Sequence, residues 1–136
     1  MKYYFDTCIW IDFFENREDR FRPLGEWALR LINKIIQENN TLLYSKLINK
    51  ELNKFYTEEL IKERFLIFPA EILKKVAIID EQIKESRILS KKLKIPRDDV
   101  LHAIIARDNN AIMITRDKHF YELSNITIIK KPEDLI

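Results

Sequence analysis

Short apolar runs alternate along the chain with longer stretches in which apolar residues recur every three or four positions. We expect the short runs to form strands, at residues 2–5, 41–44, 65–68, 111–114 and 126–129. We expect the longer stretches to form helices, at residues 9–14, 23–36, 46–55, 58–64, 71–93, 97–106 and 117–123. This order predicts an α/β fold, a three-layer α/β/α sandwich with a central, mainly parallel sheet.

Polar residues between these segments indicate how the segments are joined. The pairs Asn39-Asn40 and Asn109-Asn110 can adopt the left-handed backbone that ends a helix, in place of glycine. Ser45 is placed to cap the helix that follows the second strand. The run at 65–68 is also compatible with the end of a buried helix, because its periodicity does not separate the two.

The stretch 95–106 contains the clearest helix start. Pro96 favours a helix that begins near Arg97, and the carboxylates Asp98 and Asp99 then fall in its first turn. Asp99 shares a helix face with small alanines that permit close packing. We therefore expect Asp99 to be partly buried.

The apolar run 111–114 is short and has no polar face, which is typical of a central strand in a parallel sheet. Thr115, Arg116 and Asp117 follow it directly. The carboxyl ends of strands are where open α/β sheets bind their ligands, so these residues are candidates for a functional site.

Two further acids occupy unusual positions. Asp6 lies at the corner between the first strand and the first helix, where a helix N-cap is an adequate explanation by itself. Glu51 lies inside the apolar stripe of the helix at 46–55, where a carboxylate is costly unless it is paired, exposed at a cleft or bound to a cation. A salt bridge to Lys50, Lys54 or a more distant residue remains an alternative for Glu51.

Composition limits the class of protein. The chain has 136 residues and a formal net charge of +2, which predicts one soluble globular domain over residues 1–136 and not a polybasic one. The single cysteine, Cys8, excludes a disulfide framework and favours a reducing, cytoplasmic location. We find neither a secretory signal nor an apolar run long enough to cross a bilayer, so no membrane association is expected.

The chain lacks the residues that several common enzymatic chemistries require. One glycine in the whole chain excludes a glycine-rich phosphate loop, a dinucleotide fingerprint and a serine nucleophile elbow. His102 and His119 are not spaced as a zinc pair. A haloacid-dehalogenase-type phosphatase requires an aspartate two positions after Asp6, where this chain has Cys8.

The acids that remain can converge on one sheet edge; they are Asp6, Glu51, Asp99 and Asp117. Such carboxylates suit Mg²⁺ or Mn²⁺ and repel one another without a cation. This is the type of site that cleaves phosphodiesters with a metal-activated water.

These residues lie in four motifs that follow one another along nearly the whole chain: Phe5-Asp6-Thr7; Ser45 with Glu51; Asp99-Val100-Leu101-His102-Ala103 with Ala106; and Thr115-Arg116-Asp117-Lys118-His119-Phe120. With them the sequence resembles PIN-domain proteins, and it is most similar to the VapC-type toxins of type II toxin–antitoxin systems. Two positions depart from the family pattern, because Cys8 replaces the more usual Ser or Asn and an Asn replaces the glycine often found before the fourth strand.

The resemblance implies a metal-dependent endoribonuclease that acts on RNA, forms a homodimer and is inhibited by a cognate VapB-type antitoxin whose tail enters the acidic pocket. It implies that the catalytic metal ligands are Asp6, Glu51, Asp99 and Asp117, with Mg²⁺ or Mn²⁺ as the cofactor. Thr7 and Thr115 would assist them. Asp98 is a rival to Asp99, although the alanine spacing favours Asp99.

The expected reaction is in-line attack of a metal-activated water on phosphorus, which leaves 5′-phosphate and 3′-hydroxyl ends. The candidate phosphate-binding cations are Lys46, Lys50, Arg97, Arg116 and Lys118. His102 is expected to be a hydrogen-bonded packing residue.

Two other functions remain open, a housekeeping nuclease that matures ribosomal or transfer RNA and an inactive PIN fold used as a binding module. The chain's short length favours the toxin over the housekeeping enzyme, and its four acids argue against inactivity. Self-association is expected because Trp10, Phe13, Phe14 and Trp27 supply more large apolar surface than a small domain readily covers.

Overall fold

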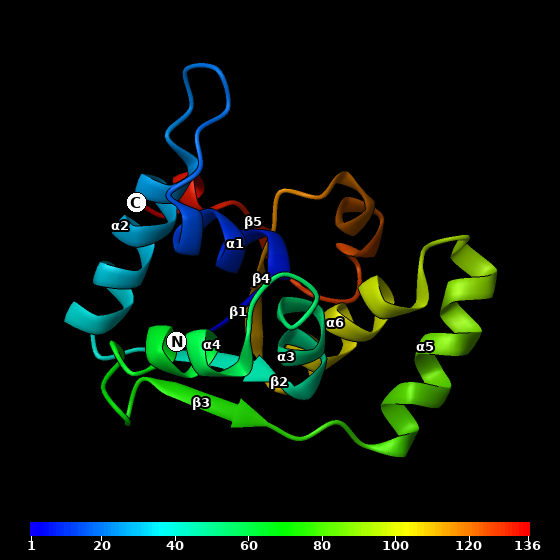
Figure 1. Ribbon diagram of the computed structural model, residues 1–136. Helices are drawn as coiled ribbons and strands as arrows, with labels where there is room; N and C mark the ends of the chain where they lie inside the picture. Colours follow the sequence, from blue (N-terminus) through cyan, green and yellow to red (C-terminus); the bar gives the residue numbers. More distant parts are fainter.

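A computed structural model describes residues 1–136 and has a five-stranded sheet at its centre (Figure 1). The strands are β1 (Lys2–Phe5), β2 (Thr41–Ser45), β3 (Leu73–Val76), β4 (Ala111–Ile114) and β5 (Ile129–Lys130). Their order in the sheet is β3-β2-β1-β4-β5, and every neighbouring pair is parallel. The predicted α/β class and parallel sheet are thus confirmed.

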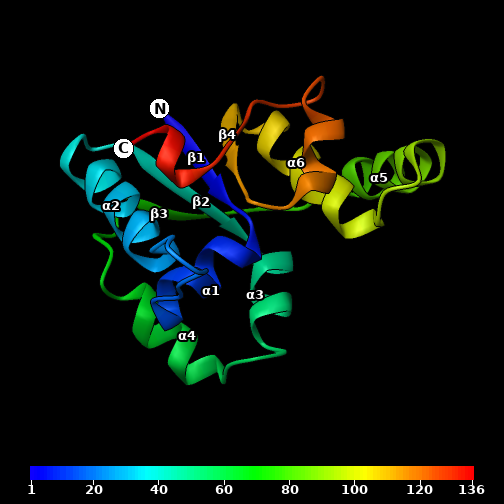
Figure 2. The ribbon, with the colours of Figure 1, turned by 90° about the horizontal axis from the view of Figure 1, so that it is seen from above.

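Helices cover both faces of this sheet (Figure 2). One face carries α1 (Thr7–Glu15), α2 (Leu24–Gln37) and α4 (Glu58–Phe65), and the other carries α6 (Arg97–Asp108) and the 3₁₀ turn η1 (Lys118–Leu123). The short α3 (Lys46–Leu52) leaves the carboxyl end of β2, α5 (Asp80–Leu93) packs against α6, and a second 3₁₀ turn, η2 (Pro132–Asp134), packs against α2. None of the helices is long and apolar enough to cross a membrane.

The third strand is not where the hydrophobic pattern predicted it. Residues 65–68 are the end of α4 and the turn after it, whereas β3 lies at 73–76, inside the stretch expected to be one helix from 71 to 93. Lys74 and Lys75 are exposed on this edge strand, so it lacks the apolar character of a buried strand. The apolar residues in and beside this strand happen to lie three or four positions apart, and this spacing is the one that predicts a helix.

Helix α5 therefore begins only at Asp80, where the Gln82 side chain accepts a hydrogen bond from the Ile79 N–H at 2.9 Å. The last strand is also displaced. It was expected at 126–129, and the structure pairs only Ile129 and Lys130 with β4. Thr127 instead turns inward and donates a hydrogen bond to the Ala111 carbonyl oxygen.

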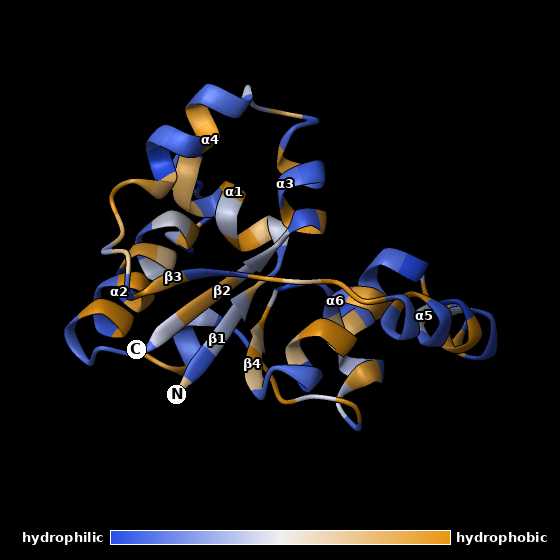
Figure 3. Ribbon diagram, turned by 90° about the horizontal axis from the view of Figure 1, so that it is seen from below, coloured by the Kyte–Doolittle hydropathy of each residue, from blue (hydrophilic) through white to orange (hydrophobic).

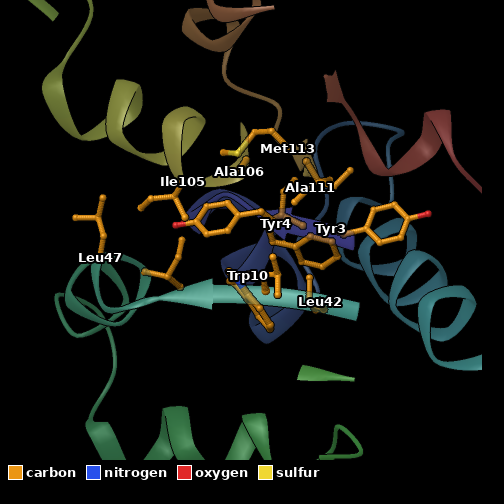
Figure 4. Packing of buried hydrophobic residues seen from close by; sticks show 14 of the residues in the cluster. Tyr3, Tyr4, Trp10, Leu42, Leu47, Ile105, Ala106, Ala111 and Met113 are labelled. Atoms are coloured by element: carbon orange, nitrogen blue, oxygen red, sulfur yellow. The ribbon is translucent and has the colours of Figure 1, made fainter. Parts of the chain in front are cut away.

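The aromatic residues that led us to expect self-association lie mostly inside the molecule. Trp10 has no exposed surface, and the rings of Phe5, Phe14 and Phe65 pack around it. Figure 4 shows Trp10 among the buried side chains of this core, which include Tyr4 of β1 and Leu42 of β2. These side chains form the core between the sheet and α1, so they give no argument for a dimer. Figure 3 shows the same arrangement by hydropathy, with the apolar sides of the helices turned toward the sheet.

The only glycine in the chain permits a close approach between two helices. Gly25 lies in the first turn of α2, and a Cβ built on it would lie 2.3 Å from the Cα atom of Asn16, the residue that ends α1. Asn16 has a left-handed backbone, with φ of 48°, and the Gly25 N–H donates to the carbonyl oxygen of Arg17 at 2.9 Å. The loop from α1 to α2 thus turns directly against the backbone of Gly25.

Candidate metal centre

The strand order creates one position where connections diverge to opposite faces of the sheet. Strands β1 and β4 are neighbours, and the chain leaves β1 into α1 on one face while α6 leads into β4 from the other. Ligands of open α/β sheets bind at such a point, outside the carboxyl ends of the strands. Asp6 follows β1, Asp117 follows β4 by three residues, and Asp99 lies in the first turn of α6.

Asp6 joins the ends of β1 and β4. Its Oδ1 accepts a hydrogen bond from the Thr7 N–H at 2.8 Å, so it does cap α1, as one explanation of this residue predicted. Its Oδ2 accepts from the Thr115 hydroxyl at 2.8 Å, and that hydroxyl accepts from the Asp117 N–H at 3.1 Å. Capping therefore uses one oxygen of Asp6, while the other connects it to the segment that carries Asp117.

Asp99 and Asp117 lie together with His119, which the sequence motifs did not single out as a ligand. The ligating atoms of Asp99, Asp117 and His119 all lie within 4.8 Å of one another. Asp98 is outside this group, and its carboxylate lies 3.6 Å from the Arg97 guanidinium. The geometry thus places Asp99, and not Asp98, at the candidate centre. The position of His119 two residues after Asp117 is the only sequence feature that could have indicated it.

Glu51 is paired, but not with a neighbouring lysine. Its Oε1 contacts Nε2 of His102 and accepts a hydrogen bond from the Thr7 hydroxyl at 3.1 Å. Burial would raise the pKa of Glu51, yet the hydrogen bond and charge of His102 outweigh it and leave this pKa below its ordinary value. The carboxylate is therefore held ionised at the edge of the centre.

A buried chain of hydrogen bonds fixes His102 in turn. The imidazole has no exposed surface, and its Nδ1 lies 2.8 Å from the Tyr4 hydroxyl, which lies 2.8 Å from the Ser45 hydroxyl. Ser45 occupies the cap position of α3, but its side chain makes this contact and no capping bond. Burial disfavours protonation of His102, but the nearby carboxylate of Glu51 outweighs burial and raises the pKa of His102 above its usual value. The interpretation of His102 as a hydrogen-bonded packing residue agrees with these contacts.

The surroundings of Asp99 disfavour its ionised form. Burial and the charges of Asp6 and Asp117 raise the pKa of Asp99 to about 6. The Cys8 thiol, 3.3 Å from Asp6 Oδ2, is also held protonated, because burial and the Asp6 charge raise its pKa well above the ordinary value. A divalent cation at this edge would relieve the repulsion, and carboxylate oxygens are the ligands that Mg²⁺ and Mn²⁺ prefer. The residues present thus fit such an ion.

The candidate phosphate-binding cations differ in whether their charged groups are free to bind phosphate. Lys46, Lys50, Arg97 and Lys118 are exposed. Arg116 is not, since its guanidinium pairs with Asp12 at 3.3 Å and Glu133 at 2.8 Å. It also lies over the Trp27 ring, 5.5 Å from the centroid. Arg116 therefore joins α1, α2 and η2, and its contacts leave it poorly placed to hold an RNA phosphate.

The four acids differ in exposure: Asp6 is buried, Glu51 and Asp99 are partly buried, and Asp117 is the most exposed. The largest hollow of the molecule, about 450 Å³, lies between Tyr44 of β2 and α4, and none of the hollows is lined by any of the four acids. The acids therefore do not line an enclosed pocket of the kind that usually surrounds a small metabolite.

Comparison with known proteins agrees with this geometry. A family model described as "PIN domain" matches residues 3–126. Three solved structures cover nearly the whole chain. The first is VapBC2 from Rickettsia felis bound to a DNA fragment from its promoter, with a TM-score of 0.71 and 20% sequence identity. The similarity covers 96% of this chain and 98% of the Rickettsia felis chain. A toxin–antitoxin complex from Klebsiella pneumoniae has a TM-score of 0.63 at 19% identity, with coverage of 96% and 97%.

The third structure, FitAcB from Neisseria gonorrhoeae, has a TM-score of 0.63 at 18% identity and covers 99% of this chain and 100% of its own. No curated protein sequence matches the chain. At these identities the structural similarities establish the fold.

Proposed function

The chain belongs to the PIN-domain family, and from this premise we propose that it is a metal-dependent endoribonuclease and the toxin of a type II toxin–antitoxin pair. The single observation that carries the proposal is the gathering of Asp6, Asp99 and Asp117 at the diverging ends of β1 and β4, with Glu51 beside them. Burial, together with repulsion from Asp6 and Asp117, raises the pKa of Asp99 to about 6, so its ionised carboxylate destabilises the protein without a cation. Such an arrangement is expected where a cation is part of the working site.

We assign the four carboxylates to the binding of Mg²⁺ or Mn²⁺. When bound, such an ion supplies a water activated for attack on phosphorus and offsets the charge on the leaving 3′ oxygen. Thr115 holds Oδ2 of Asp6 and the backbone of Asp117 in place, and Thr7 and His102 hold the carboxylate of Glu51. The exposed cations Lys46, Lys50, Arg97 and Lys118 attract the phosphates of the RNA on either side.

The function is tested by RNA cleavage with the purified protein. Single-stranded RNA should be cut in the presence of Mg²⁺ or Mn²⁺, and an excess of EDTA should stop cleavage, because the carboxylates alone supply no activated water. The products should carry 5′-phosphate and 3′-hydroxyl ends, which end-labelling identifies. Cleavage that continues in EDTA and leaves cyclic phosphates would contradict the proposal.

Metal binding should also depend on pH. With the pKa of Asp99 at about 6, its carboxyl is mostly ionised at pH 7 and mostly protonated at pH 5, so the affinity for Mn²⁺ should fall about tenfold between them. Because this pKa lies above its unfolded value near 4, the contribution of Asp99 to the stability of the metal-free protein is fully present below pH 4 and is lost as the pH rises through 6. Calorimetric titration with Mn²⁺ at both pH values, with Asp99→Asn as the control, measures the effect.

We further propose an antitoxin partner and a homodimer. The three similar structures include toxin–antitoxin complexes, and this supports a partner of that kind. A short neighbouring gene that encodes a DNA-binding domain with a basic tail would support the toxin over a housekeeping nuclease. Light scattering at micromolar concentration tests the dimer.

A further inference from the structure

His119 is a second histidine close to the acids, and unlike His102 it makes no buried hydrogen bond with its ring. Its Nδ1 lies 3.6 Å from Oδ2 of Asp99 and 3.6 Å from Oδ1 of Asp117. We propose that His119 is a nitrogen ligand of the divalent ion, which gives the site a preference for Mn²⁺ over Mg²⁺. This inference rests on the proposed function only for the presence of the ion.

The spacing of the three ligating atoms suits one ion. Around a six-coordinate ion with bonds of about 2.1–2.2 Å, neighbouring ligand atoms lie about 3 Å apart and opposite ones about 4.4 Å apart. The two distances of 3.6 Å lie within this range, and the three ligating atoms lie within 4.8 Å of one another. Small rotations of the exposed His119 and Asp117 side chains would bring their ligating atoms and Oδ2 of Asp99 to a common centre.

The local backbone holds the imidazole at this position. The His119 N–H donates a hydrogen bond to Asp117 Oδ1 at 3.0 Å, so the histidine and the aspartate are fixed relative to each other. The next residue, Phe120, is fully buried and anchors η1 to the core. The His119 side chain itself is 59% exposed, so coordination displaces water and breaks no packing.

The other nitrogen and sulfur groups near the centre are committed elsewhere. Both nitrogens of His102 have partners, Tyr4 and Glu51, and the imidazole is completely buried. The Cys8 thiol lies 3.3 Å from Asp6 Oδ2 and 3.9 Å from the Thr115 hydroxyl oxygen. His119 is therefore the one imidazole in the chain with a nitrogen facing two of the acids and still free to coordinate.

The expected metal preference follows from ligand chemistry. Mg²⁺ favours an all-oxygen octahedral shell and retains its waters, whereas later divalent ions accept imidazole more readily. A nitrogen ligand beside the carboxylates thus strengthens binding of Mn²⁺ more than binding of Mg²⁺. Replacement of His119 by Gln keeps a polar side chain of similar length and removes the imidazole.

The test is pulsed electron paramagnetic resonance of the full-length protein loaded with Mn²⁺, without RNA. The wild type should show ¹⁴N coupling from a directly bound imidazole, and His119→Gln should lose it. Glu122→Gln, an exposed position on the same 3₁₀ turn, is the matched control and should keep it. By calorimetry, His119→Gln should weaken Mn²⁺ binding about tenfold and change Mg²⁺ binding less than about threefold.

A wild-type spectrum without ¹⁴N coupling, or coupling that persists in His119→Gln, would overturn the inference. So would a His119→Gln protein that binds RNA more weakly but binds Mn²⁺ normally, because His119 would then contact the phosphates. The outcome is separate from that of the proposed function. Imidazole coupling in a protein that cuts no RNA supports the inference and refutes the nuclease, and metal-dependent cleavage without such coupling does the reverse.

Discussion

Asp99→Asn should reduce RNA cleavage by roughly 10³-fold, which corresponds to about 4 kcal/mol of transition-state stabilisation lost with a charged ligand. The same change should leave the metal-free protein as stable or more stable, since it removes a carboxylate whose pKa is raised to about 6 by burial and by the charges of Asp6 and Asp117. With allowance for solvent screening we expect a gain of about 1 kcal/mol, or about 4 °C in Tm. The rise in Tm that Mn²⁺ gives the wild type should shrink in the variant.

Asp98→Asn is the matched control, because it makes the same chemical change at the adjacent position of α6. Asp98 lies beside Arg97 and outside the group of ligating atoms, so this variant should cut RNA at the wild-type rate and respond normally to Mn²⁺. An active Asp99→Asn with an inactive Asp98→Asn would move the ligand by one residue. Activity in both variants would remove α6 from the site.

Gly25→Ala should lower the free energy of unfolding by about 3 kcal/mol and Tm by about 10 °C. In an isolated helix the same change is stabilising by about 1 kcal/mol, because alanine is the better helix former. Here the added Cβ would lie 2.3 Å from the Asn16 Cα and 2.6 Å from its carbonyl carbon, and backbone atoms cannot rotate away as a flexible side chain can. Urea unfolding and thermal melting measure the change.

The control for Gly25→Ala is a substitution to alanine at an exposed position of the same helix, where the new side chain contacts no other element. Asn33 is exposed on α2, and Asn33→Ala should raise the free energy of unfolding by about 0.5 kcal/mol through helix propensity alone. If Gly25→Ala raised the free energy of unfolding as Asn33→Ala does, the prediction would be wrong. The ends of α1 and α2 would then move apart more easily than the close contact with Asn16 implies.

Local sequence was a good guide where local physics decides the conformation. Asn39 and Asn110 both have a left-handed backbone, with φ of 54° and 55°, as expected of asparagine in place of glycine. Helix α6 begins at Arg97, directly after Pro96, which fixes its own φ and lacks an N–H. Strands β1, β2 and β4 lie where apolar runs predicted them, because buried parallel strands have no polar face to obscure the pattern.

Local sequence did not predict the structure of segments whose environment is formed by residues far away in the chain. Strand β3 pairs only with β2 at the edge of the sheet, so its two lysines remain in water and its pattern is not that of a buried strand. The sequence also left the pairing partner of Glu51 undecided, because that partner comes from a distant part of the chain. His102 is 51 residues away along the chain, and no spacing rule connects positions on α3 and α6.

By itself, then, the sequence determined the α/β class and most of the elements, and it singled out four acids as candidates, because periodicity and turn chemistry depend on neighbours along the chain. Only the tertiary structure decided that Asp99 and not Asp98 lies among the acids, that Arg116 pairs with Asp12 and Glu133, and that His119 joins Asp99 and Asp117. It also decided the sign of the effect at Gly25. These are contacts between segments far apart in sequence, and their energies depend on distances that the packing of whole elements sets.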